Sequence, residues 1–158
     1  MKFCVVVANG SRARFYSLKR PEFPELNGRP QLIDKGEIFE PELQERAQDL
    51  WTERTGVNRG AGSSSHSYDD HRNQHQAEFE KRFARQVADR AVKVIRSSHA
   101  DKLVLCGARR QLPLLRGILD EKLQGVHIQQ LAKDLLQLDS HTLYEHLHKE
   151  GFLPPRSD

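Results

Sequence analysis

The sequence has few of the features that mark secreted, membrane-spanning or metal-binding proteins. It contains only two cysteines, Cys4 and Cys106, among 158 residues. A disulfide framework and a zinc site made of paired CxxC units are therefore both excluded. The longest apolar run, residues 3–8, is far shorter than the roughly 18 residues of a membrane span and too short for a signal-peptide core. These absences predict a reduced, soluble, cytoplasmic protein.

The apolar pattern predicts an α/β fold. Residues 3–8 and 103–107 are apolar without alternation, which is typical of strands covered on both faces. Asn9-Gly10 predicts a hairpin, because both residues tolerate positive φ. Three further strands are expected at 13–18, 31–39 and 126–131, and helices at 42–51, 74–97, 112–123 and 140–149, the last capped by Asp139 or Ser140.

We therefore expect a five-stranded mixed sheet, an antiparallel meander plus parallel strands, with helices on both faces. Residues 3–8 and 103–107 should be adjacent and parallel at its centre. This arrangement is similar to a ribonuclease-H-like sheet. The length predicts a single domain over residues 1–150, followed by an extended tail at 151–158.

Glycine and serine are crowded into residues 55–73, which predicts a flexible loop. The helix expected after this loop has an apolar stripe of Phe79, Phe83 and Val87 and a basic remainder. Residues 71–96 contain seven Lys or Arg against three acids.

The common catalytic patterns are absent. Residues 1–18 contain no Asp or Glu, which argues against a two-metal nuclease on this sheet. There is no GxSxG nucleophile elbow, and the glycine-rich residues 58–62 lack the ending of a P-loop. Cys4 and Cys106 are expected to be buried and inert. We expect no cofactor and no catalytic residue.

Three histidines, His66, His71 and His75, lie within ten residues of each other. A metal site is one interpretation, since His71 and His75 would share a helix face. A solvated polar loop is the other, and without HExxH or a supporting cysteine it is preferred, so no metal is expected.

The basic helix and the loop before it are the remaining candidates for function. Arg59 and Arg72 in the loop, with Arg82 and Arg85 on the helix, predict contacts with the phosphates of a nucleic acid. Further loop contacts are expected from His66, Tyr68, His71 and His75. The alternative is a solvated charged face with no ligand.

Several segments resemble the bacterial family called "protein required for attachment to host cells". They are Val5–Tyr16, Arg59-Gly60 with the serines after it, Glu80–Ala84 and Ala132–Leu135. One departure is Gly107-Ala108-Arg109-Arg110, where the family more often has an Ala-Pro-Pro-Arg-like turn.

That family is more remotely similar to the central domain of eukaryotic and archaeal class-1 peptide-chain release factors. In those factors a Gly-Gly-Gln loop leads into a long basic helix. This chain has no Gly-Gly-Gln, so the resemblance implies contact with ribosome or tRNA but no peptidyl-tRNA hydrolysis. Two alternatives stay open: a protein-interaction or regulatory module that affects attachment indirectly, and a hydrolase that uses the histidine-containing loop. The oligomeric state is not predicted.

Overall fold

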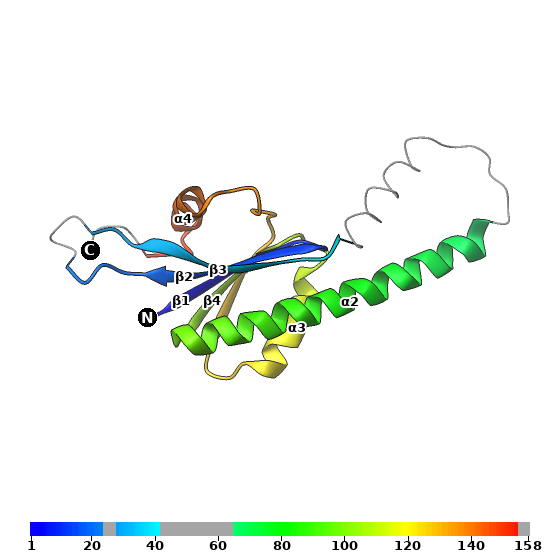
Figure 1. Ribbon diagram of the computed structural model, residues 1–158, viewed down its shortest axis with the longest axis horizontal. Helices are drawn as coiled ribbons and strands as arrows, with labels where there is room; N and C mark the ends of the chain where they lie inside the picture. Colours follow the sequence, from blue (N-terminus) through cyan, green and yellow to red (C-terminus); the bar gives the residue numbers. More distant parts are fainter. Residues whose placement is uncertain (24–27, 42–64, 155–158) are drawn as a thin grey trace.

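Five strands form one mixed sheet in the order β3-β2-β1-β4-β5, and helices cover both of its faces (Figure 1). The computed structural model describes residues 1–23, 28–41 and 65–154, with side chains from residue 74 onward in the last range. The elements are β1 (Phe3–Ala8), β2 (Arg12–Lys19), β3 (Gln31–Phe39), α2 (Ser65–Ser98), β4 (Lys102–Gly107), α3 (Leu112–Lys122), β5 (His127–Leu131) and α4 (Ser140–Lys149).

The predicted sheet is confirmed, including its centre. All six residues of β1 are buried, and β1 pairs antiparallel with β2 and parallel with β4. Val6, for example, lies opposite Phe15 of β2 and Leu105 of β4. A strand that is apolar on both faces must have a layer of side chains on each side, and this requirement places β1 in the middle.

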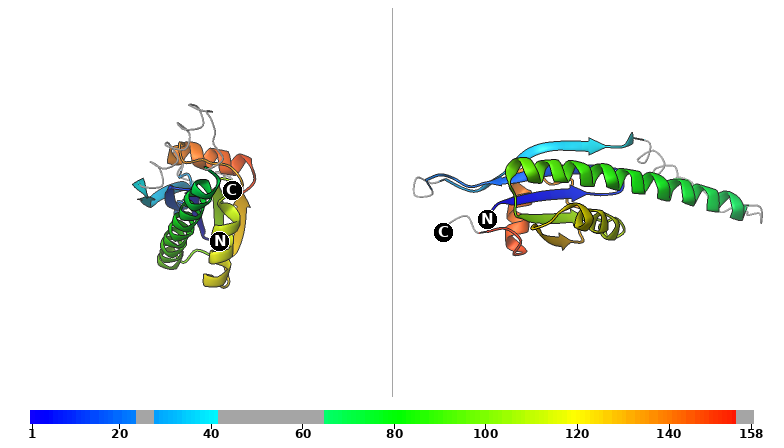
Figure 2. Two further views of the ribbon diagram at one scale, coloured as in Figure 1. Left: turned by 90° about the vertical axis from the view of Figure 1, so that its right-hand side faces the viewer. Right: turned by 90° about the horizontal axis from the view of Figure 1, so that it is seen from below.

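Two apolar clusters fill the space above and below the sheet. On one face, Val6 and Leu103 pack with Phe83, Val87 and other residues of α2 and α3. On the other face, Val5 and Val104 pack with Leu143, Tyr144 and Leu147 of α4. Figure 2 shows α2 and α3 together on one side of the strands and α4 on the opposite side.

The two cysteines are buried on opposite faces of the sheet. Cys4 belongs to the cluster under α2, whereas Cys106 belongs to the cluster under α4. Burial raises the pKa of each thiol to about 12. Both side chains belong to the core, so the prediction that they are buried is confirmed.

The predicted start of the long helix was wrong. The sequence predicts a loop over residues 65–73, but α2 begins at Ser65. No glycine or proline occurs between Gly62 and Gly107, so the helix held by the core can propagate toward its N-terminus. The helix expected at 42–51, the rest of the loop at 55–64 and the tail at 155–158 lie outside the described residues.

Replacing Val6 by Asp should unfold the protein. Val6 is 0% exposed, and an unpaired buried carboxylate costs several kcal/mol against a total stability of about 5–15 kcal/mol. Circular dichroism should show loss of secondary structure, whereas Val6→Ala should stay folded with a loss of about 2 kcal/mol in urea denaturation. A folded Val6→Asp protein would contradict the central placement of β1.

Asp139 is the N-cap of α4, and its carboxylate accepts a hydrogen bond of 2.7 Å from the backbone N–H of Thr142. This bond lowers the pKa of Asp139 below its ordinary value of 3.8. The contribution to stability should be complete above that ordinary value and lost as the pH falls through the lowered one. Thermal melts of Asp139→Ala should show a lower Tm than the parent at neutral pH and a converging Tm in acid. Asp139→Asn should retain most of the cap.

Candidate functional site

The carboxyl ends of the three parallel strands, β1, β4 and β5, meet at one edge of the sheet. After β1 the chain continues into β2, which lies on one side of the β1–β4 pair. After β4 it continues through α3 into β5, which lies on the other side of that pair. Strand order reverses at this point, and open α/β sheets generally bind ligands at such a switch point. Three loops lie there: the turn after β1, the turn after β4 and the segment after β5.

Short contacts join these loops. Asn9 Nδ2 donates to Asp134 Oδ2 at 3.4 Å, across 125 positions of sequence. A Cβ atom on Gly10 would lie 3.1 Å from Nε2 of Gln111, and one on Gly107 would lie 3.1 Å from the carbonyl oxygen of Ala8. The two glycines therefore allow the turns to approach closely, which is a physical reason for glycine at both positions.

The hairpin predicted at Asn9-Gly10 is confirmed, because β1 and β2 pair antiparallel on either side of it. The turn does not use the positive φ that both residues tolerate, since neither is among the described residues that have it. Instead, Asn9 Oδ1 accepts hydrogen bonds from the backbone N–H groups of Ser11 at 3.0 Å and Arg12 at 2.9 Å. The side chain closes the turn and at the same time turns its amide toward Asp134.

The outer face of α2 is the second part of the candidate site. Arg82 and Arg85 are exposed, and the Arg82 guanidinium carbon lies 5.3 Å from the centre of the Phe79 ring. This cation–π contact holds one arginine against the helix while leaving its N–H groups accessible. His75 is also exposed and lies seven residues before Arg82, so the two helix positions are on one side.

Some charges of α2 are neutralised by α3 and the turn before it. Asp89 pairs with Lys122 at 3.1 Å, and Glu80 pairs with Arg110 at 3.4 Å. Arg90 belongs to the fold, since its guanidinium donates to the carbonyl of Lys35 at 3.2 Å. Five exposed cations of α2 form no ion pair with another described residue: Lys81, Arg82, Arg85, Lys93 and Arg96.

The structure connects only part of the predicted site. Arg59 lies outside the described residues, whereas the backbone positions of His66, Tyr68, His71 and Arg72 fall within α2. They continue the same helix that carries Arg82 and Arg85, and do not form a loop above it. Within the described ranges, no three His, Cys, Asp or Glu side chains are grouped so that they could hold a metal ion.

No local pattern in the sequence places Asn9, Gln111 and Asp134 in one site. Asn9 and Asp134 occur in segments that carried the family resemblance, but they are separated by almost the whole chain. Only the pairing of β1 with β4 and of β4 with β5 brings these segments to one edge.

Taken together, the fold and this surface define an α/β protein with an open mixed sheet and a long basic helix packed on one face. A family model described as "Protein required for attachment to host cells" matches residues 4–147. The chain belongs to this family, as its resemblance in sequence predicted. A comparison with curated proteins found no match. No helix in the described part of the chain is long and apolar enough to span a membrane.

Replacing Asn9 by Ala should loosen the carboxyl edge of the sheet. The change leaves the N–H groups of Ser11 and Arg12 without their acceptor, and we expect urea denaturation to show a loss of about 1–2 kcal/mol. Asn9→Asp keeps the acceptor but places a carboxylate beside Asp134. The pair Asn9→Asp with Asp134→Asn should therefore be more stable than Asn9→Asp alone. Equal stability of the two would show that the contact with Asp134 has no energetic role.

Proposed function

We propose that this protein binds RNA, on the ribosome or as tRNA, through the outer face of α2. The observation that carries the proposal is a set of five exposed cations on one helix that lack ion-pair partners among the described residues. Unpaired cations in a row attract a polyanion over a distance set by the Debye length, which is about 8 Å at physiological salt.

The shape of α2 supports such contacts. The helix continues past the edge of the sheet, so its N-terminal part stands away from the rest of the molecule (Figures 1 and 2). From Arg82 to Arg96 the axis advances about 21 Å, which is enough to follow several successive phosphates. The buried stripe of Phe83, Val87 and Ala91 fixes the helix to the sheet and thereby fixes the direction of its outer face.

The chemistry of these residues favours the backbone of the nucleic acid over its bases. Arginine donates a planar set of N–H groups that matches a phosphate, whereas no described aromatic side chain on the outer face of α2 is placed for stacking on a base. Binding would therefore depend on shape and charge more than on base sequence.

Peptidyl-tRNA hydrolysis is not part of the proposal, because the chain has no Gly-Gly-Gln. A module of the release-factor central-domain type that has lost this motif would still present a basic helix to RNA. Such a role places the protein in the cytoplasm, where it would influence attachment through translation.

Replacing both Arg82 and Arg85 by Glu should abolish association with RNA. The fold should persist, since both side chains are exposed and lie off the buried stripe. Gel shifts with tRNA and sedimentation with ribosomes at about 50 mM salt, where phosphate contacts are strong, would measure the loss. For the unmodified protein, three or four phosphate contacts should give a log–log salt slope of about −2 to −3.

A matched control reverses two exposed cations elsewhere, Arg29→Glu with Lys149→Glu, and so changes the net charge equally. This variant should retain most of the RNA binding. If the unmodified protein neither shifts tRNA nor sediments with ribosomes, the RNA proposal fails and a protein-interaction module becomes the better hypothesis. Equal loss in both variants would show that only net charge matters and would exclude α2 as the specific surface.

A further inference from the structure

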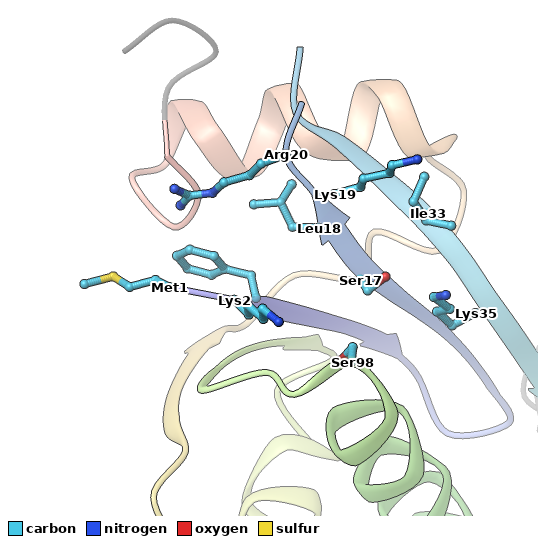
Figure 3. A pocket seen from close by; sticks show the side chains of 10 residues that line it. Met1, Lys2, Ser17, Leu18, Lys19, Arg20, Ile33, Lys35 and Ser98 are labelled. Atoms are coloured by element: carbon cyan, nitrogen blue, oxygen red, sulfur yellow. The ribbon is translucent and has the colours of Figure 1, made fainter. Parts of the chain in front are cut away.

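A cleft of about 660 Å³ lies at the end of α2 away from its projecting N-terminal part. It opens where the helix stops, beside the residues that precede β1, the end of β2 and the start of β3. Figure 3 shows the side chains around this opening, which come from these three strands, from the residues just outside β1 and β2 and from the last turn of the helix. Its volume falls within the range of about 300–1,000 Å³ that is usual for small-molecule sites.

Among the described residues, the cleft is lined by four cations and by no carboxylate. The cations are Lys2, Lys19, Arg20 and Lys35, and the other lining residues are Met1, Phe3, Ser17, Leu18, Ile33 and Ser98. None of the four cationic side chains forms an ion pair with another described residue. Lysine and arginine are both charged at neutral pH, so this concave surface carries an uncompensated positive charge.

The two acids nearest to Lys35 in sequence do not neutralise it. Asp34 and Glu37 lie on the other face of β3, opposite Tyr16 and Arg14. Glu37 pairs with Arg12 and Arg14, and the hydrogen bond from Arg12 lowers the pKa of Glu37.

Asp101, which precedes β4, is also engaged. Its Oδ1 accepts the backbone N–H of Lys2 at 2.9 Å, and this bond lowers the pKa of Asp101. The carboxylate fixes the backbone before β1 and leaves the Lys2 side chain available to the cleft.

The end of α2 is capped, which reduces the negative potential that a helix C-terminus would bring to the cleft. His99 has a φ of 56° and stops the helix, and the N–H of Ala100 then donates to the carbonyl of Ile95 at 3.0 Å. The hydroxyl groups of Ser97 and Ser98 donate to the carbonyl of Val94 at 3.1 and 2.7 Å. These are the bonds of a closed helix end, so the carbonyl groups of the last turn are largely satisfied.

The remaining lining combines apolar surface with one hydroxyl group. Leu18 and Ile33 are half-buried, and Ser17 is half-buried with no side-chain hydrogen bond to a described residue. We propose that this cleft binds the phosphate groups of a small phosphorylated molecule, whose uncharged part lies against Ile33. The four cations hold the phosphates, and Ser17 supplies a neutral donor.

Two sources could supply this chemistry: a free nucleotide or the 5′-phosphate end of an RNA strand. The cleft shares no residue with the cations of α2 that carry the RNA proposal. Binding of a small phosphorylated molecule can therefore be tested independently of binding to tRNA or ribosomes.

The test is isothermal titration of the full-length protein with five probes in the presence of EDTA. The probes are inorganic pyrophosphate, ATP, adenosine and a short oligoribonucleotide with or without a 5′-phosphate. We expect pyrophosphate and ATP to bind and adenosine not to bind. ATP binding more tightly than the phosphorylated oligonucleotide would identify a free nucleotide as the ligand, and the reverse order would identify an RNA end.

Lys19→Ala combined with Lys35→Ala should weaken pyrophosphate binding by at least about tenfold, the effect of losing one charge-assisted hydrogen bond. Lys19→Arg with Lys35→Arg should largely preserve it. The matched control is Lys122→Ala with Lys149→Ala, two exposed lysines outside both the cleft and the set of α2 cations. Equal thermal melts would show that every variant is folded.

The inference fails if pyrophosphate and ATP do not bind at about 1 mM, a concentration that reveals even weak sites. It also fails if the control lysines matter as much as Lys19 and Lys35. The charge-reversed α2 variant, Arg82→Glu with Arg85→Glu, should bind pyrophosphate like the parent protein, which keeps the two proposals apart.

Discussion

The parallel pairing of β1 with β4 is the constraint on which the rest of the structure depends. Both strands are buried on both faces, so their stability requires a helical layer on each side of the sheet. A parallel connection also requires a long crossover, and α2 belongs to that crossover. One stripe of α2 is consequently buried in the core, whereas the opposite side of the helix faces solvent and can carry charge.

The same constraint separates two basic surfaces along α2. Its outer face carries arginines that lack ion-pair partners among the described residues, and the sheet beyond its C-terminal end forms the lysine-lined cleft. The helix is too short at this end to cover β2 and β3 completely, because His99 stops it and Ala100 leads directly into β4. The cleft is therefore a consequence of where the helix ends and does not depend on a special loop.

Much of the fold could be predicted from local patterns. Unbroken apolar runs at residues 3–8 and 103–107 identified the central strands, and the stripe of Phe79, Phe83 and Val87 identified the helix that covers them. Less of the candidate site could be predicted. The role of Asn9 in closing a turn with its own side chain competes with the glycine-based turn that Asn9-Gly10 suggests, and local sequence does not decide between them. The N-terminal start of α2 was missed because serines at 63–67 resemble a loop, although the following residues contain no helix breaker.

By itself, the sequence determined which residues are buried, the class of the fold and the presence of a basic helix, because these properties follow from the periodicity of neighbouring residues. Family membership could also be recognised from short segments, and it holds for residues 4–147. Only the tertiary structure decided which distant residues meet. Asn9 reaches Asp134, and Lys2, Lys19 and Lys35 line one cleft, because strands far apart in the chain are aligned in one sheet. Whether a charge is paired or free depends on such alignments, and no local pattern in the sequence records them.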